Sequence, residues 1–326
     1  MVSRRKRKVP AHKGKCSLRS GGWILLGVFC GLVLVLALFF SSRGGRPPFD
    51  EARSFEHILH QCSFGPRIPG TKAHRDCLEY ITKELGRYAT QITHHNFIHM
   101  SYALNKEVTG TNIWARLKGS QAKESILLCA HWDSRPFADR DPSPANRGKG
   151  VPGANDGASG VALLLEVARI LGCKPPTREV HIILFDMEDM GDLPPNALHK
   201  DPFCIGSTRF VQDNPDFRPS WGILVDMVGK RGLRIKKEAI SVSWAPHLVH
   251  RIWTIARKKG STVFSEEVGQ PIFDDHVPFL QRGIPVVNLI DMDYPYWHTV
   301  EDTPDKCSPK SLREVAEVIL EVIYGP

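Results

Sequence analysis

"EVHIILFDMEDMGD", residues 179–192, joins an apolar run to a group of acidic residues. Residues 180–185 have the length and the β-branched character of a buried strand. Four carboxylates follow almost at once: Asp186, Glu188, Asp189 and Asp192. Carboxylates this close repel one another unless a metal ion, a basic partner or bulk water lies between them. The stretch therefore predicts a strand that ends at a charged site.

The same kind of apolar run occurs three more times, in "ESILLCA", "WGILVDMV" and "IPVVNLI". Helical periodicity separates or follows these runs, in "SGVALLLEVARILG", "APHLVHRIWTIARKKG" and "SPKSLREVAEVILEVIYG". Two further helical and two alternating segments precede them, between residues 49 and 119. Strands that alternate with helices are typical of an α/β fold. We expect a three-layer sandwich with a mostly parallel central sheet.

The positive charge of the chain is concentrated at its start. The net charge is +8, and residues 1–20 contain eight basic and no acidic residues. Without those eight, the 43 basic residues fall to 35, which equals the number of acidic residues. A nucleic-acid-binding protein should carry its basic patch on the folded domain. We therefore expect no nucleic-acid partner.

An uncharged apolar segment follows this basic tail. No charge occurs from Ser20 to Ser42, a length that can span about 30 Å of hydrocarbon as a helix. A cleaved signal peptide and a buried core helix are the alternatives, but the apolar run is long and lacks a convincing cleavage site. We predict a cytoplasmic tail (1–20), a transmembrane signal anchor (21–41), a linker (42–49) and a catalytic domain (50–326). That domain would face the periplasm, the cell exterior or the secretory lumen, where Cys62 and Cys77 could form a disulfide.

Metal-binding residue types follow each predicted strand. Ligands of open α/β sheets bind beyond the carboxyl ends of the strands. The residues found there, or in the turn "VPGANDGASG", are His131, Asp133, Asp156, Glu188, Asp189, Asp226, Asp291, Asp293 and His298. Each alone is more often a turn or surface residue, and an acidic edge without metal is the alternative. Two histidines with several carboxylates favour a zinc site.

Six motifs look like the motif series of the zinc aminopeptidase and glutaminyl cyclase family, in the family's order: "AHWDS", "GANDGASG", "FDMED", "LVDMVG", "FDDHVPFL" and "YWHTVEDTP". The resemblance covers roughly residues 50–326. In an aminopeptidase it implies two zinc ions on His131, Asp156, Asp189, Asp226 and His298. It also implies that Glu188 is the general base and that Asp133 orients a histidine ligand. Asp189 departs from the glutamate that is more frequent in aminopeptidases.

The glutaminyl cyclase branch is the more similar of the two. For that branch the resemblance implies one zinc on Asp156, Asp189 and His298, with Asp274 as catalytic acid and Trp297 as an apolar wall. Animal cyclases have a histidine where this chain has Asn288. Their disulfide is also missing, because Cys129 is one residue displaced and Val161 stands at the partner position. No clear tryptophan follows Glu188. We therefore expect a member that diverges from the animal enzymes.

The two branches imply different reactions at peptide N-termini. In a cyclase, the α-amine of an N-terminal Gln attacks its own γ-amide, and pyroglutamate and ammonia form. Glu188 would move the proton, while Asp226 and Asp274 would share another. In an aminopeptidase, water attacks the peptide bond, and His131 and Asp226 hold a second zinc. We favour the cyclase; the aminopeptidase and a non-catalytic binding domain are the alternatives.

Overall fold

The central sheet has six strands in the order β1–β2–β4–β3–β5–β8. The computed structural model describes residues 45–121, 124–191 and 201–325. Four neighbouring strands run parallel: β4 (Glu179–Phe185), β3 (Ser125–His131), β5 (Trp221–Asp226) and β8 (Val286–Ile290). The antiparallel hairpin of β1 (Gln91–Ser101) and β2 (Lys106–Leu117) extends this sheet along β4. The sheet is therefore mostly parallel, and its parallel strands end at one edge.

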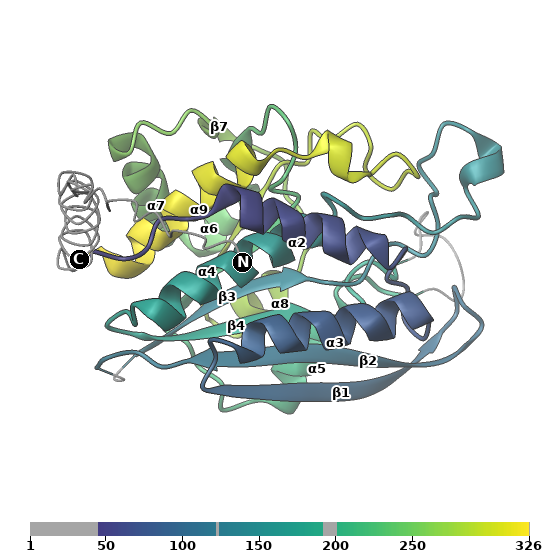
Figure 1. The fold of residues 1–326 in the computed structure, drawn as a ribbon, viewed down its shortest axis with the longest axis horizontal. Helices are drawn as coiled ribbons and strands as arrows, with labels where there is room; N and C mark the ends of the chain where they lie inside the picture. Colours follow the sequence, from purple (N-terminus) through teal and green to yellow (C-terminus); the bar gives the residue numbers. More distant parts are fainter. Residues whose placement is uncertain (1–44, 122–123, 192–200, 326) are drawn as a thin grey trace, which may run out of the picture. The chain divides into compact units, whose positions relative to one another are not determined.

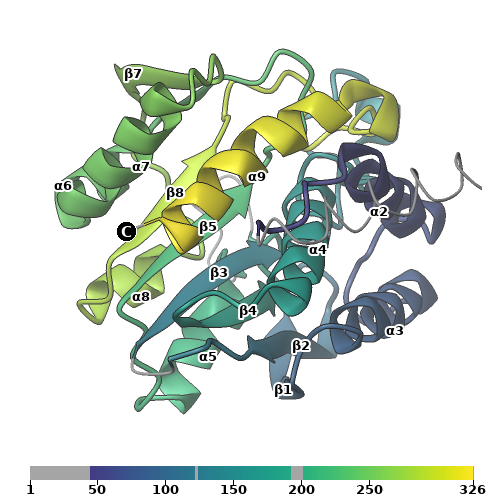
Figure 2. The same ribbon diagram turned by 60° about the vertical axis from the view of Figure 1, so that its left-hand side comes forward.

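Helices cover both faces of the sheet (Figure 1). One face carries α2 (Glu51–Ser63), α3 (Lys72–Gly86), α4 (Ala158–Cys173), α7 (Pro246–Lys258) and α9 (Pro309–Tyr324). Figure 2 shows α9, α4 and α3 side by side across this face. The other face carries α5 (Ile205–Asp213) and α8 (Val277–Gln281). The short α6 (Ala239–Trp244) contacts α7 and β8.

Side-chain alternation along the strands produces the two apolar layers. In β3, Ile126, Leu128 and Ala130 pack into the larger cluster with α4 and α9. Leu127 and Cys129 point the other way, toward Phe210 of α5 and Phe279 of α8. A strand that is buried on both faces is apolar at nearly every position, which is why the predicted strands read as almost continuous runs.

The predicted three-layer α/β class is confirmed, with additions that the periodicity did not predict. The turns Pro144–Asn146 and Pro304–Lys306 are 3-10 helices. A separate two-stranded parallel sheet forms from β6 (Ile235–Lys237) and β7 (Phe264–Val268). These strands are only three and five residues long, and β7 is largely exposed, so they carry little hydrophobic pattern.

Two predictions about the flanking features have different outcomes. The predicted anchor at 21–41 and the tail before it lie outside the described residues. In the part of the chain that is described, no helix combines the length and the apolar character needed to cross a bilayer. Cys62 and Cys77 have free thiols in this structure. Their apolar surroundings raise the pKa of each thiol, to about 11 and about 12.

Candidate active site

The carboxyl ends of the parallel strands bring the predicted ligands together. His131 is the last residue of β3 and Asp226 is the last residue of β5. Asp189 follows β4, His298 follows β8, and Asp156 lies in the turn before α4. All five side chains are at least nine-tenths buried.

The five side chains form two groups that share Asp156. In the first group, His131 Nε2 lies 3.1 Å from Asp156 Oδ1 and 3.3 Å from Asp226 Oδ1. In the second, His298 Nε2 lies 3.1 Å from Asp189 Oδ1 and 3.8 Å from Asp156 Oδ2. Within each group the ligand atoms lie within 4.8 Å of one another. One oxygen of Asp156 faces each group, which is the arrangement of a bridging carboxylate.

The electrostatics of these groups fit a bound cation. Asp156 Oδ2 and Asp189 Oδ2 are buried without a hydrogen-bond partner. Burial, together with Asp189 and Asp226, raises the pKa of Asp156 to about 7. Burial alone would lower the pKa of His131, yet hydrogen bonds with Asp133, Asp156 and Asp226 raise it well above its usual value. A divalent cation would remove this excess of negative charge, and two imidazoles with carboxylates are ligands that suit zinc.

Two further acids orient the histidines. Asp133 Oδ1 lies 3.4 Å from His131 Nδ1. The same carboxylate accepts the backbone N–H groups of Glu188 and Asp189, both at 3.1 Å. Asp139 Oδ1 lies 3.3 Å from His298 Nδ1. Each histidine therefore has an acid behind its second ring nitrogen.

Close backbone contacts fix Asp156 in place. Asp302 accepts the N–H groups of Asn155 at 2.9 Å and of Asp156 at 3.1 Å. Gly157 follows with φ of 87°, and a Cβ there would lie 2.8 Å from Asp133 O. Only glycine fits both the conformation and the space. The Gly-rich turn predicted from "GANDGASG" is therefore needed to bring Asp156 to the histidines.

Strained backbone is concentrated at the site. In the described residues, five non-glycine residues have positive φ, and four of them lie at or beside site residues: Met187, Cys204, Met227 and His298. Such conformations cost about 1–3 kcal/mol each and persist only where the surroundings hold them. Cys204 is held by the hydrogen bond from its N–H to Glu188 O, at 2.9 Å.

Glu188 and Asp274 form a second pair of acids beside the metal-type groups. The carboxylates of both residues and the Cys204 thiol lie within 4.8 Å of one another. Cys204 donates from Sγ to Glu188 Oε1 at 3.2 Å. Burial raises the pKa of Glu188 well above its usual value, and Asp189 and Asp274 add to this increase. Burial and Asp226 raise the pKa of Asp274 to about 6. Both carboxyl groups therefore hold a proton more readily than an exposed acid does.

Asn288 lies behind Asp274 rather than in the cavity. Its Nδ2 donates to Asp274 Oδ2 at 2.7 Å, and its own N–H donates to Ser241 Oγ at 3.0 Å. Asp226 lies close enough to Asp274 to raise the pKa of that carboxyl, so the proton that the two are expected to share stays a prediction. Asp226 Oδ1 also contacts His131 Nε2, and Asn288 holds Asp274.

A cavity of about 350 Å³ lies above these groups. Its apolar lining includes Ile272, Phe273, Ile290, Met292 and Trp297. The Trp297 ring lies 3.9 Å from the His298 ring, so the predicted apolar wall is next to a predicted ligand. Such a cavity can take one side chain of moderate size with its polar end at the acids.

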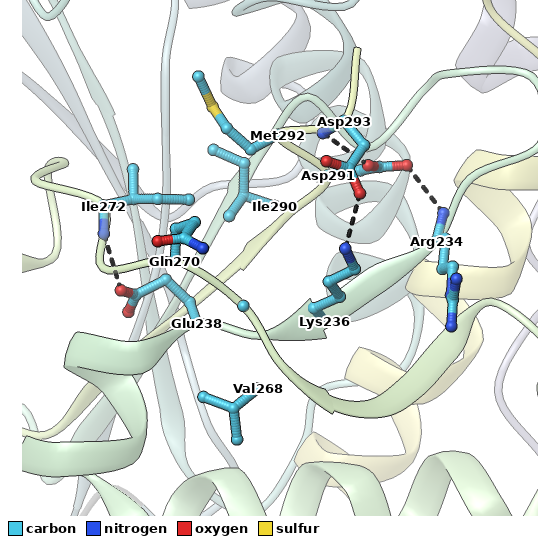
Figure 3. A pocket seen from close by; sticks show the side chains of 11 residues that line it. Arg234, Lys236, Glu238, Val268, Gln270, Ile272, Ile290, Asp291, Met292 and Asp293 are labelled. Carbon is cyan, nitrogen blue, oxygen red and sulfur yellow. Dashed lines mark hydrogen bonds and ion pairs between the residues drawn. The ribbon is translucent and has the colours of Figure 1, made fainter.

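A smaller pocket of about 160 Å³ adjoins this cavity (Figure 3). The two share Gln270, Ile272, Ile290 and Met292 as lining residues. The prediction that Asp291 and Asp293 join the metal-type cluster is wrong, because both line this second pocket. Lysines neutralise them: Lys230 Nζ lies 2.8 Å from Asp291, and Lys236 Nζ lies 2.8 Å from Asp293.

The structure adds Arg135, Asp139 and Cys204 to the predicted residues. Arg135 donates to Asp139 with two nitrogens, at 3.0 Å each, and to Asp189 O at 3.0 Å. The i, i+4 spacing of Arg135 and Asp139 just after "AHWDS" could have indicated this ion pair from the sequence. No sequence pattern indicates Cys204, because it contacts Glu188 from 16 residues further along the chain. Asp186, unassigned from sequence, is buried and binds His74 Nε2 at 3.0 Å and Thr111 N at 2.7 Å. Asp192 lies outside the described residues.

Comparisons with known proteins agree with this geometry. The model of "Peptidase family M28" matches residues 112–323. A glutaminyl cyclase structure from Tannerella forsythia has a TM-score of 0.80 and 37% identity, covering 86% of this chain and all of that one. A Zn-dependent exopeptidase from Parabacteroides distasonis has a TM-score of 0.81 and 34% identity, with the same coverage. Aminopeptidase YwaD of Bacillus subtilis is 26% identical over 64% of this chain, which spans only 42% of that protein's length.

Proposed function

The chain belongs to peptidase family M28, and on that basis we propose that it is a zinc-dependent glutaminyl-peptide cyclotransferase. It would convert N-terminal Gln of peptides or proteins into pyroglutamate with release of ammonia. Relatives in this family include both cyclases and exopeptidases, so membership alone does not choose between the two activities. The choice rests on the residues of the cavity.

The single observation that carries the proposal is the position of Asp274 beside Glu188. Both acids have a raised pKa and lie in one cavity with the metal-type groups. Cyclisation needs one proton removed from the attacking amine and one delivered to the departing nitrogen. Glu188, whose pKa is raised further by Asp274 beside it, suits a residue that accepts this proton and then returns it.

Asp156, Asp189 and His298 would hold one zinc ion. Two observations support this choice. Asp156 Oδ2 and Asp189 Oδ2 are buried without a hydrogen-bond partner, and the group combines one imidazole with two carboxylates. When bound, zinc would polarise the γ-amide carbonyl as a Lewis acid. Asp139 and Arg135 would keep His298 and Asp189 oriented, through the contacts described above.

The chain's own residues would move the protons. The α-amine nitrogen of the substrate attacks its γ-carbonyl carbon, so a C–N bond forms within one residue. Glu188 takes a proton from that amine and returns it to the amide nitrogen, whose C–N bond breaks to release ammonia. Asp274, held by Asn288, would keep the pKa of Glu188 raised, so that Glu188 can carry this proton between the two nitrogens. Because nucleophile and carbonyl belong to one residue, much of the rate comes from holding the ring-closing conformation in the cavity.

The second candidate is an aminopeptidase, and one observation favours it. His131 and Asp226 complete a second metal-type group around Asp156. With two metals, Glu188 would instead activate water for attack on the first peptide bond. The free α-amine would then be bound rather than reactive.

We further propose that residues 21–41 anchor the enzyme in a membrane, with residues 1–20 in the cytoplasm. The uncharged run and its basic flank support this orientation. Protease protection of sealed vesicles tests it: the tail and the catalytic domain should be cleaved from opposite sides. Cleavage of both from one side would contradict the proposal.

Ammonia release tests the cyclase proposal. The zinc-loaded protein should release ammonia from Gln-Ala-amide and leave Leu-Ala-amide intact. Glu188→Gln should lower the rate by roughly a hundred-fold or more, because the proton carrier is lost. Release of free Leu by the unmodified protein would instead establish the aminopeptidase.

A further inference from the structure

Arg140 is positioned at the mouth of the cavity by the site itself. Its backbone N–H donates to His298 O at 3.2 Å. Its guanidinium carbon lies 5.3 Å from the centre of the Trp297 ring. The side chain lines the cavity, yet the residue is exposed, so it lies at the opening. Its neighbour Asp139 contacts His298, and the whole segment is therefore fixed against a predicted ligand.

Arg140 has no acidic partner among the described residues. Of the described side chains that line the cavity, it is the one with a fixed positive charge. The cations of the adjacent pocket differ, because each is paired: Lys236 with Asp293 at 2.8 Å, as Figure 3 shows, and Arg234 with Glu267 at 2.6 Å. Contact with the face of Trp297 leaves the guanidinium N–H groups available in its plane.

We propose that Arg140 binds a carboxylate on the second residue of the substrate peptide. Arginine presents a planar array of donors that matches a carboxylate. The N-terminal residue must reach Glu188 and the predicted zinc ligands at the base of the cavity. An extended chain advances about 3.4 Å per residue, so the next residue emerges at the opening where Arg140 lies. The proposal rests on the proposed function only in requiring a peptide with a free N-terminus in this cavity.

Two substrate groups can supply this carboxylate. One is the side chain of an acidic second residue, and the other is the free C-terminus of a dipeptide. Peptide amides separate them. In the first pair, Gln-Glu-Ala-amide offers only a side-chain carboxylate, and Gln-Gln-Ala-amide is its neutral counterpart of equal shape. In the second pair, Gln-Ala as a free acid offers only a C-terminal carboxylate, and Gln-Ala-amide is its neutral counterpart.

The experiment measures kcat/KM for these four peptides with the unmodified enzyme and with Arg140→Gln and Arg140→Glu. The enzyme should prefer the charged member of at least one pair by about three- to ten-fold, mainly through KM. Arg140→Gln should abolish the preference and Arg140→Glu should reverse it. High salt should weaken it, because the group is exposed. Lys258→Glu is the matched control. It makes the same change of charge as Arg140→Glu, but at an exposed position in the last turn of α7, and it should leave the preference unchanged.

Binding separates this proposal from the proposed function. Glu188→Gln should still bind peptides, so calorimetry can compare Gln-Glu-Ala-amide with Gln-Gln-Ala-amide without turnover. A tighter Kd for the first, lost in the double variant with Arg140→Gln, would support Arg140 even if the enzyme proves to be an aminopeptidase. Equal kcat/KM and equal Kd within both pairs, or a preference that survives Arg140→Gln, would overturn the proposal. Failure of any peptide to bind would overturn both proposals.

Discussion

His131 Nε2 lies 3.3 Å from Asp226 Oδ1, a contact that serves either as a hydrogen bond or as one half of a second metal site. In the cyclase account it is a hydrogen bond, and only the group around His298 binds zinc. We predict that the purified protein holds one zinc ion per chain and that His298→Ala loses it. His131→Ala should retain zinc and lose only part of the activity, roughly ten-fold. Metal analysis of the three proteins after dialysis checks this, and two tightly bound ions in the unmodified protein would contradict it.

The pH profile should show the raised pKa of Glu188. Glu188 must be ionised to accept a proton, so activity is lost as the pH falls through its pKa. Because burial and the neighbouring acids raise that pKa, the acidic limb of kcat/KM should lie well above pH 4.5. Asp274→Asn removes one of those charges, so we expect the limb to move to lower pH while kcat falls. An unchanged limb in this variant would remove Asp274 from the electrostatics of the base.

The hydrogen bond from Cys204 to Glu188 should orient the base. A donor stabilises the ionised carboxylate, so Cys204→Ala should move the acidic limb upward and reduce kcat by about three- to ten-fold. Cys204→Ser keeps a hydrogen-bond donor, so its acidic limb and its kcat should both lie close to those of the unmodified protein. The thiol is fully buried and its pKa is raised by burial and by Glu188, so thiol reagents should not modify the native protein. Equal effects of Ala and Ser would indicate a packing role alone.

Glu238 connects the cavity wall to the fold. Its carboxylate accepts from the N–H groups of Ile240 at 2.7 Å, Ser241 at 2.6 Å and Ile272 at 3.0 Å, the last visible in Figure 3. Burial opposes its ionisation, but hydrogen bonds with His276 and these amides lower its pKa to about 2. Glu238→Gln should therefore reduce the free energy of unfolding by about 1–3 kcal/mol and raise KM, because Ile272 loses its anchor.

The pH dependence of this contribution has a definite sign. The folded-state pKa is below the usual 4.5, so the stabilisation is present above about pH 4.5 and is lost as the pH falls toward 2. Denaturant titrations at pH 7 and at pH 3 should show a smaller difference between Glu238→Gln and the unmodified protein at the lower pH. The exposed Glu266→Gln is the control and should cost less than about 0.5 kcal/mol. A difference that does not change with pH would contradict the account.

Sequence periodicity was sufficient to predict the helices and strands that bury the most surface. The runs around Ile182, Leu128 and Leu289 predicted strands because a parallel sheet buries both faces. The ligands could be predicted because strand ends converge, as His131 and Asp226 do. The position of Cys204 could not be predicted, since it depends on the path of the long connection between β4 and α5.

Asp291 and Asp293 show where the same reasoning fails. Both follow β8 at the carboxyl end, but their backbone passes the site and enters the adjacent pocket, where Lys230 and Lys236 bind them. The position of a side chain just beyond a strand depends on the loop, which periodicity does not describe. Asp291 is buried and needs a cation, which Lys230 provides in place of a metal, whereas Asp293 is exposed and pairs with Lys236.

The central claim is tested most directly by one mass spectrum. The zinc-loaded protein is incubated with a mixture of two peptides that differ only in beginning with Gln or with Leu. The account predicts that the Gln peptide loses one ammonia while the Leu peptide keeps its mass, and that Glu188→Gln leaves both unchanged. Loss of the first residue from either peptide would contradict the account and make His131 and Asp226 ligands of a second zinc.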